Sequence, residues 1–358
     1  MRVRIKDIAE KAGVSTGTVD RVIHNRGNVA PKVKEHVEKV MMEMGYKRNI
    51  IASTLAYNKT HRIAALIFEQ EDPYWKQIHQ GVDRALEATQ HYGVTVDTFF
   101  CDQGSPAMFQ NLVEEVLDSR PDGVLVAPLF LKEGRDFLQK CHRLSIPVAI
   151  INTQVPKARA LCYIGQDSYQ SGVIAARLLN FGMKKRATVL LLNLDPGPTN
   201  AQHLVDKERG FRDYFKEIDG KSIRVLSENF ERYHDLKALR LRFLQILEEH
   251  PDLAGIFVTN SRAYLLLKAL EHQYIDDLVI VGFDLVDPNI RNLKSNRINF
   301  IINQNPMLQG YLGVINLVNH LILRQEVAQI QYLPLDIVVR ENCDYYTRTS
   351  VTYPTVIY

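Results

Sequence analysis

Residues 4–28 read RIKDIAEKAGVSTGTVDRVIHNRGN and predict two short helices joined by a tight turn. The first helix carries an apolar stripe at helical spacing, made of Ile5, Ile8, Ala9 and Ala12. Gly13 favours a helix stop because glycine tolerates a left-handed backbone at little cost. Ser15 is a good N-cap for the second helix, since its hydroxyl can accept a hydrogen bond from an otherwise orphaned backbone N–H.

The second helix has two faces of different character. Its apolar face is made of Val19, Val22 and Ile23. Its polar face is made of Gly17, Asp20, Arg21 and His24. Because so short a helix is unstable alone, the apolar face must pack on the first helix, which leaves the polar face outward as DNA major-groove binding requires. The alternative is a pair of packed helices without a DNA-binding role.

The positive charge of the chain is concentrated near its N-terminus. Residues 1–60 contain 12 Lys and Arg against 6 Asp and Glu, a net charge of +6, whereas the whole chain has a net charge of +3. We therefore expect a polyanionic partner for this N-terminal module only.

The sequence also predicts a cellular compartment. No apolar run approaches the ~18 residues that cross a bilayer, and the charged N-terminus lacks the apolar core of a secretory signal. The cysteines are scattered without metal-ligand spacing: Cys101, Cys141, Cys162 and Cys343. We expect buried free thiols, a cytoplasmic protein and no membrane partner.

Two further segments complete the N-terminal region. Pro31 fits the first turn of a third helix, which Gly45 ends. Residues 47–60 form a linker that is compatible with a short helix and is unusually apolar at Ile50, Ile51, Leu55 and Tyr57. This linker could instead be a segment that packs against a neighbouring domain.

From His61 onward, apolar runs typical of strands alternate with helical stretches. The strand-like runs are 62–68, 94–100, 122–128, 147–152, 187–193, 222–229, 253–259, 278–284 and 298–302. The helical stretches are 74–91, 106–119, 133–144, 168–182, 203–218, 235–249, 261–272 and 306–323. This alternation predicts parallel sheets with helices on both faces. The region is too long for one comfortable sheet, so we expect two α/β lobes.

Ligands of open parallel sheets bind beyond the carboxyl ends of the strands, so residues that follow the apolar runs are candidates for a pocket. These candidates are Asp72, Tyr74, Trp75, Phe130, Asp167, Asn260, Asp284 and Gln304. Carboxylates, amides and aromatic faces together suit a polyhydroxylated ligand. Individually, Trp75 could be a core residue, Asp167 and Asn260 could cap helices, and Asp284 could close a turn.

The order of these parts resembles the lactose-repressor/galactose-repressor family of bacterial transcription regulators. The motifs that carry the resemblance are IKDIA at 5–9, AGVS at 12–15, TV at 18–19, RV at 21–22, GY at 45–46 and VGFD at 281–284. The resemblance covers nearly the whole chain. It implies an all-α helix–turn–helix DNA-binding domain, followed by a two-lobed α/β domain similar to periplasmic binding proteins of type I.

The resemblance also implies roles for individual residues. Base-reading positions of the second helix are matched by Thr16, Gly17 and Arg21. Phosphate or groove-edge positions are matched by Ser15, Thr18, Asn25 and Asn28. Residues 49–57 match a hinge helix that orders on DNA, in which Leu55 inserts into a minor-groove base step.

Effector-contacting positions are matched by Asp72, Trp75, Phe130, Asp167, Asn260, Asp284 and Gln304. Lys207 stands where the family typically has a ligand-gripping arginine, and it offers a point charge rather than a planar fork. Other departures from the family pattern are Asp20 on the DNA-facing helix, Arg48 in place of a hinge proline, and Ser261 after Asn260.

The resemblance implies four segments along the chain. These are a helix–turn–helix domain at 1–46, a hinge at 47–60, an effector-binding and dimerisation domain at 61–341, and a tail at 342–358. Within the effector-binding domain we assign about 61–161 and 292–324 to the first lobe, and about 165–289 and 328–341 to the second. The tail lacks the leucine heptads of a tetramerisation helix, so we expect a homodimer.

We therefore expect a repressor that binds a roughly palindromic double-stranded DNA operator and is switched by a small molecule, most simply a mono- or oligosaccharide. A purine or another non-sugar co-repressor is the alternative effector. We expect no catalytic residue, metal or cofactor, because GxGxxG, P-loop, GxSxG and clustered metal-ligand motifs are missing. Two rival classes are a transport solute-binding protein and a glycoside hydrolase that would use Asp167 and Asp284 as its acid/base pair.

Overall fold

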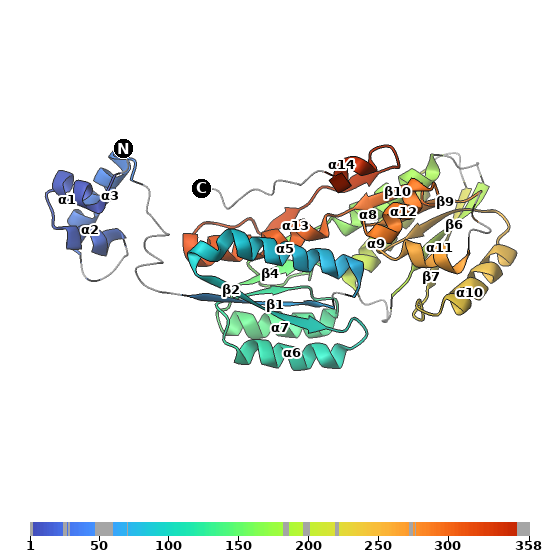
Figure 1. Cartoon of the computed structure of the whole chain (residues 1–358), viewed down its shortest axis with the longest axis horizontal. Helices are drawn as coiled ribbons and strands as arrows, with labels where there is room; N and C mark the ends of the chain where they lie inside the picture. The colour runs from blue at the N-terminus through green and yellow to red at the C-terminus, as the bar shows by residue number, and fades with distance from the viewer. Residues whose placement is uncertain are drawn as a thin grey trace. The chain divides into compact units, whose positions relative to one another are not determined.

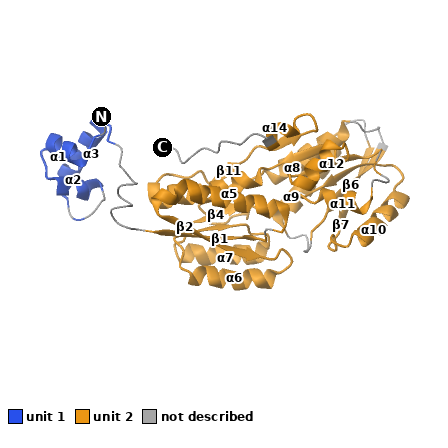
Figure 2. Ribbon diagram, in the orientation of Figure 1, with its two compact units in different colours: residues 1–59 blue, residues 60–358 orange. Residues whose placement is uncertain are grey.

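The structure is a computed structural model that describes residues 3–23, 27, 29–46, 60–69, 71–181, 186–195, 201–218, 222–271, 275 and 277–348. The chain divides into two compact units, residues 1–59 and 60–358, which Figure 2 shows in two colours. Some predictions lie outside the described residues: the hinge helix at 49–57, Leu55 within it, and the groove-edge residues Asn25 and Asn28.

The described part of the first unit contains the helices α1 (Ile5–Ala12), α2 (Thr16–Ile23) and α3 (Pro31–Glu43). They share one small core, made of Ile8, Ala9, Ala12, Val19, Val22, Val37 and Val40. Gly13 follows α1 with a left-handed backbone at φ +64°, and the Ser15 hydroxyl accepts a hydrogen bond from the Thr18 N–H at 3.1 Å. The predicted helix pair, its turn and its cap are confirmed.

The first sheet of the second unit is parallel throughout, with the strand order β11-β5-β4-β3-β1-β2. Its strands are β1 (His61–Phe68), β2 (Val94–Cys101), β3 (Gly123–Val126), β4 (Val148–Ile151), β5 (Cys162–Gly165) and β11 (Ile330–Tyr332). Figure 1 shows helices on both faces of this sheet. They are α5 (Pro73–Thr89) with α13 (Pro306–Val318), and α6 (Pro106–Asp118) with α7 (Leu131–Arg143).

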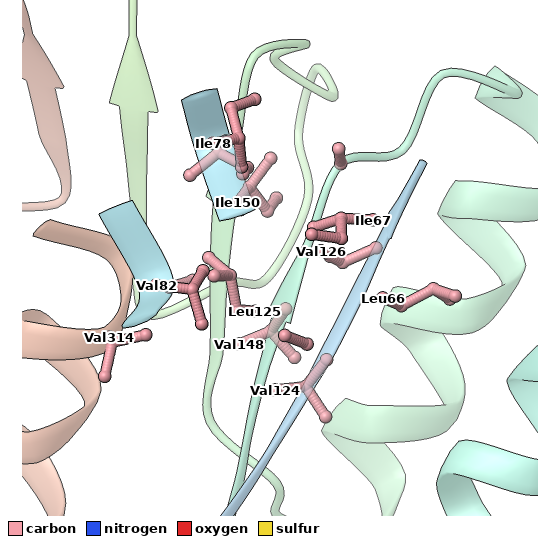
Figure 3. Close-up of a cluster of buried hydrophobic side chains, with 14 of the residues drawn as sticks. Leu66, Ile67, Ile78, Val82, Val124, Leu125, Val126, Val148, Ile150 and Val314 are labelled. Carbon is pink, nitrogen blue, oxygen red and sulfur yellow. The ribbon is translucent and has the colours of Figure 1, made fainter. Parts of the chain in front are cut away.

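The core of this first lobe explains its continuous apolar strands. Both faces of a central parallel strand are covered by helices, so every residue of β3 and β4 is buried. Figure 3 shows strand residues meeting Ile78 and Val82 of α5 and Val314 of α13 in one cluster.

The second sheet has the order β12-β10-β9-β8-β6-β7. Its strands are β6 (Arg186–Asn193), β7 (Ser222–Asn229), β8 (Leu253–Val258), β9 (Val279–Phe283), β10 (Phe300–Asn303) and β12 (Asp336–Val338). Alternate strand residues feed two separate cores, as the two-residue period of a strand requires. One core packs on α8 (Ser168–Asn180) and α9 (Gln202–Lys216), and the other on α10 (Leu236–Glu249), α11 (Ala263–Ala269) and α12 (Asp287–Lys294).

The predicted fold class is confirmed, with corrections in detail. The second sheet is mixed, because β12 runs antiparallel to β10. The strands β5, β11 and β12 and the helices α12 and α14 (Cys343–Arg348) were not predicted, because such short elements give little periodicity. The predicted helix 306–323 is α-helical only to Val318 and continues as a π-helical turn, Asn319–Leu323.

The lobe assignment of the late segments is also corrected. The sequence placed residues 300–303 in the first lobe and residues 330–332 in the second, whereas β10 lies in the second sheet and β11 in the first. All of the cysteines are free and buried, as predicted. None of the described helices combines the length and the apolar character that a bilayer span needs.

Candidate functional site

The polar residues predicted to face DNA lie on the outer side of α2. Ser15, Thr16, Gly17 and Arg21 are exposed, whereas Val19 and Val22 are buried in the three-helix core. The Ser15 and Thr18 hydroxyls are hydrogen-bonded to each other at 2.9 Å. The helix is therefore fixed on its apolar side and presents a polar surface on the other.

A second candidate site lies between the two lobes of the second unit. A cavity of about 40 Å³ is lined there by residues from both lobes. The described lining residues are Asp72, Tyr74, Trp75, Gln103, Leu129, Asn152, Asp195, His203, Lys207, Asn260, Ser261, Arg262, Asp284 and Gln304. Most of them follow the carboxyl end of a strand, where ligands of open parallel sheets bind.

Arg262 is the best-connected side chain of this cavity. Its Nη1 donates to the Leu194 carbonyl at 2.8 Å, and its guanidinium lies over the Tyr233 ring at 4.4 Å. Its Nη2 crosses to the first lobe, where it donates to Asp72 Oδ2 at 2.8 Å and to Gln103 Oε1 at 2.7 Å. These contacts compensate for the removal of the guanidinium from water, since the Arg262 side chain is only 6% exposed.

Lys207 and Asp284 line the same cavity, but each has its own partners. The Lys207 ammonium donates to the Thr259 carbonyl at 2.7 Å and lies 3.6 Å from the centre of the Phe283 ring, and none of the described carboxylates is within ion-pair distance. Asp284 Oδ2 accepts a hydrogen bond from Gln304 Nε2 at 3.0 Å, but its Oδ1 is buried with no partner among the described residues. Burial therefore lowers the pKa of Lys207 and raises the pKa of Asp284.

A neutral histidine completes the polar lining. His203 Nδ1 is hydrogen-bonded to the Thr153 hydroxyl at 2.8 Å, a contact that joins α9 to the end of β4 across the cleft. Burial and the nearby Lys207 ammonium lower the pKa of His203 to about 3, so the imidazole is uncharged at neutral pH.

The cavity brings together most of the residues that the sequence predicted. Those that line it are Asp72, Tyr74, Trp75, Lys207, Asn260, Asp284 and Gln304. Trp75 also packs on Phe68 at 4.8 Å between ring centroids, so it is both a core residue and a lining residue. The turn alternative for Asp284 also holds, because its backbone has a positive φ of 60°.

Two predicted residues lie outside the described lining. Asp167 caps α8, with its Oδ1 accepting from the Gln170 N–H at 3.0 Å. Phe130 precedes α7 and packs edge-on against Phe68 and Phe109 in the first-lobe core. Both positions therefore have a structural role.

Sequence reasoning missed several lining residues. Gln103, Asn152 and Asp195 follow predicted strands, so the strand-end rule contained a signal for them. Arg262 also follows a predicted strand, but an arginine at the start of a predicted helix is ordinarily a solvated residue, so the rule did not single it out. Its partner Asp72 is 190 residues away in the chain.

Two family descriptions match the chain. That of the bacterial regulatory proteins of the lacI family matches residues 4–49, and that of the periplasmic binding protein domain matches residues 63–325. The chain belongs to the lacI family of bacterial regulatory proteins. The predicted membership of this family and the predicted role as a DNA-binding transcriptional regulator are thereby confirmed.

Named relatives of this lacI-family regulator agree with the assignment. The ribose operon repressor of Halalkalibacterium halodurans is 25% identical over 285 residues, which cover 78% of this chain and 80% of the relative. The sucrose operon repressor of Lactococcus lactis is 23% identical and covers 82% and 88% of the two chains. A solved structure from Bacteroides fragilis, assigned to the LacI transcriptional regulators, is 29% identical with a TM-score of 0.74 and covers 80% and 100%.

Proposed function

We propose that this lacI-family regulator is a homodimeric repressor whose affinity for an operator is switched by a sugar bound between its lobes. The proposal that the effector is a sugar rests mainly on Asp284 Oδ1, a buried oxygen of a residue that lines the cavity. This oxygen has no partner among the described residues. A ligand hydroxyl can donate to this oxygen and accept from the Lys207 ammonium at the same time. Burying an acceptor without a hydrogen bond costs roughly 1–3 kcal/mol of free energy, so a ligand that donates to this oxygen is favoured.

Two further observations support a sugar. Tyr74 and Trp75 supply aromatic faces that can cover the C–H side of a sugar ring. Among the relatives, the operons named in the repressors' descriptions are those for ribose and sucrose.

We propose that the cavity binds its ligand without converting it, and that the exposed face of α2 reads the operator. Thr16, Gly17 and Arg21 are placed on that face, which suits base contacts in a major groove. In this proposal Ser15 and Thr18 contact phosphates, and Leu55 in the hinge kinks the operator at its minor groove. The protein then acts in the cytoplasm, where its operator lies.

The sugar proposal is tested with the single tryptophan of the chain. Because Trp75 lines the cavity, titration with mono- and oligosaccharides is expected to change its fluorescence and to raise the melting temperature of the protein. Operator binding is then repeated with any sugar that responds. A response to purines without a response to any sugar would replace the sugar with the alternative effector class.

A further inference from the structure

The Asp72–Arg262 bond links the two lobes across the cleft. On the second lobe, Arg262 is anchored by the Leu194 carbonyl and the Tyr233 ring, and Asp195 lies 3.8 Å from its Nη1. Only its Nη2 bonds, to Asp72 and Gln103, reach across to the first lobe. The guanidinium therefore stays with the second lobe when these two bonds break.

The remaining space is too small for a sugar. A cavity of about 40 Å³ has room for only a few water molecules. A sugar ring therefore enters only if the lobes separate and the bonds from Arg262 Nη2 are broken. Arg262 and Asp72 both line the cavity, so a ligand that enters it meets both groups.

The chemistry of the two partners limits which ligand groups can replace their bond. The guanidinium only donates hydrogen bonds, and the carboxylate only accepts them. A hydroxyl accepts from Arg262 and donates to Asp72, so it replaces both ends of the broken bond, while Asp72 keeps its bond from the Tyr74 N–H at 2.9 Å and Arg262 its bond to the Leu194 carbonyl. A ligand carboxylate or phosphate could accept from Arg262, but it would give Asp72 no donor and would place a like charge beside Asp72 and Asp195.

A second donor and acceptor, Lys207 and Asp284, line the same cavity and have the same requirement. The Lys207 ammonium is a donor, and Asp284 Oδ1 is an acceptor without a partner among the described residues. A hydroxyl again serves both groups, whereas an acidic group serves only Lys207. The two donor–acceptor pairs are thus matched to a ligand with several hydroxyls.

We infer that Arg262 and Asp72 together determine specificity, and that the cleft selects neutral sugars over sugar acids and sugar phosphates. This inference rests on the proposed function, in which the effector is a sugar. Arg262 is then the residue that exchanges its protein partner for the ligand when the effector binds.

The inference is tested on the full-length protein with matched ligand sets. Trp75 fluorescence and melting temperature are measured with glucose, galactose and ribose, with glucuronic acid and galacturonic acid, and with the two hexose 6-phosphates and ribose 5-phosphate. Every neutral sugar that binds is expected to bind at least about 10-fold more tightly than its acidic counterpart. An acidic or phosphorylated member that binds as tightly as its neutral counterpart would overturn the inference and leave the sugar proposal standing.

Two variants locate the selectivity. Asp72→Asn removes the repelling charge while keeping a side chain of the same shape, so the preference for neutral over acidic ligands is expected to fall about 10-fold. Asp136→Asn, an exposed carboxylate on α7, is the matched control and should leave the preference unchanged. An unchanged preference in folded Asp72→Asn assigns the selectivity elsewhere. If that variant does not fold, Asp195→Asn removes the second carboxylate beside Arg262, and the preference for neutral ligands is again expected to fall. If no saccharide of any kind binds the wild-type protein, the proposed function itself fails, and this inference fails with it.

Discussion

At the scale of the residue, buried polar groups of the cleft can serve ligand binding without adding to the stability of the fold. Lys207 is 1% exposed and is compensated by one carbonyl and one aromatic ring rather than by a carboxylate. Such a cation contributes little to stability, because its desolvation offsets the contacts that it makes. Its burial inside a polar cavity instead suits a role in binding.

Lys207→Met should therefore weaken sugar binding at least about 10-fold while changing the free energy of unfolding by less than about 2 kcal/mol. The lost bond to the Thr259 carbonyl and the relieved desolvation of the ammonium act in opposite directions. Isothermal titration and chemical denaturation measure the two effects separately. Lys216→Met, on the exposed side of the same helix, is the control and should affect neither quantity by more than a small amount.

His203 makes the stability of the second unit depend on pH. The pKa of His203 is lowered from 6.5 to about 3. Between pH 3 and pH 6.5, His203 is therefore mostly protonated in the unfolded chain and mostly neutral in the folded protein. Its contribution is therefore fully present above pH 6.5 and is lost as the pH falls toward 3. His203→Gln should reduce the loss of stability between pH 7.5 and pH 4.5 by up to about 2–3 kcal/mol, as measured by chemical denaturation at both pH values. An equal loss in both proteins would show that the imidazole is already protonated in the fold.

Arg21 carries the corresponding prediction for the DNA-binding unit. It is exposed on the outer face of α2, and a bidentate contact between arginine and guanine contributes ~1–3 kcal/mol of discrimination. Arg21→Ala should weaken binding to a preferred duplex, selected from a random library, by this ~1–3 kcal/mol. The affinity for the preferred duplex should then approach the affinity for random DNA. Lys34→Ala on α3 removes one positive charge as a control, and its effect should be equal for both duplexes. Equal weakening by both variants would remove Arg21 from base recognition.

At the scale of the element, each lobe uses glycines to bring two helices into close contact. A Cβ on Gly310 of α13 would lie 2.2 Å from the Ile78 carbonyl oxygen, and one on Gly81 of α5 would lie 2.0 Å from that of Met307. In the second lobe, a Cβ on Gly172 of α8 would lie 2.0 Å from the Lys207 carbonyl oxygen. The backbone of α9 at Lys207 is therefore held directly against α8, which fixes where the ammonium emerges.

Gly310→Ala should destabilise the second unit by about 1–3 kcal/mol or more, because the clash is with backbone and the helices must move apart. The matched control is Gly17→Ala in α2, where the added Cβ meets nothing closer than 3.8 Å. That change should be neutral or stabilising for its helix, since alanine has the higher helix propensity. Scanning calorimetry of both variants measures the difference. A melting temperature for Gly310→Ala equal to that of the wild type would contradict the close helix packing.

At the scale of the whole molecule, the two proposed sites must influence each other equally. If a sugar changes operator affinity by some factor, the operator changes sugar affinity by the same factor, because the coupling free energy is shared. Titrating the sugar with and without saturating operator, and the operator with and without saturating sugar, should give equal ratios. A ratio of one in both titrations would mean that the sugar site and the operator site are not coupled, which would contradict the proposed switch.

The sequence by itself determined the elements whose signal is local. The pairing of Gly13 with Ser15 between two apolar stripes determined the helix–turn–helix, because caps and 3.6-residue periodicity depend only on neighbouring residues. The alternation of apolar runs and helices determined two α/β lobes. The strand-end rule selected Asp72 at the edge of the first sheet and Asp284 at the edge of the second as pocket residues, because ligands bind beyond the carboxyl ends of parallel strands.

Only the tertiary structure decided which distant groups meet. The sequence has no signal for β12 turning antiparallel to β10, nor for the crossing of β10 and β11 between the lobes. It predicted a role for Asp72 but not its partner, since the contact with Arg262 joins residues 190 positions apart and exists only when two separately folded lobes close on each other. Local periodicity fixes an element, whereas the pairing of buried charges depends on the packing of the whole domain.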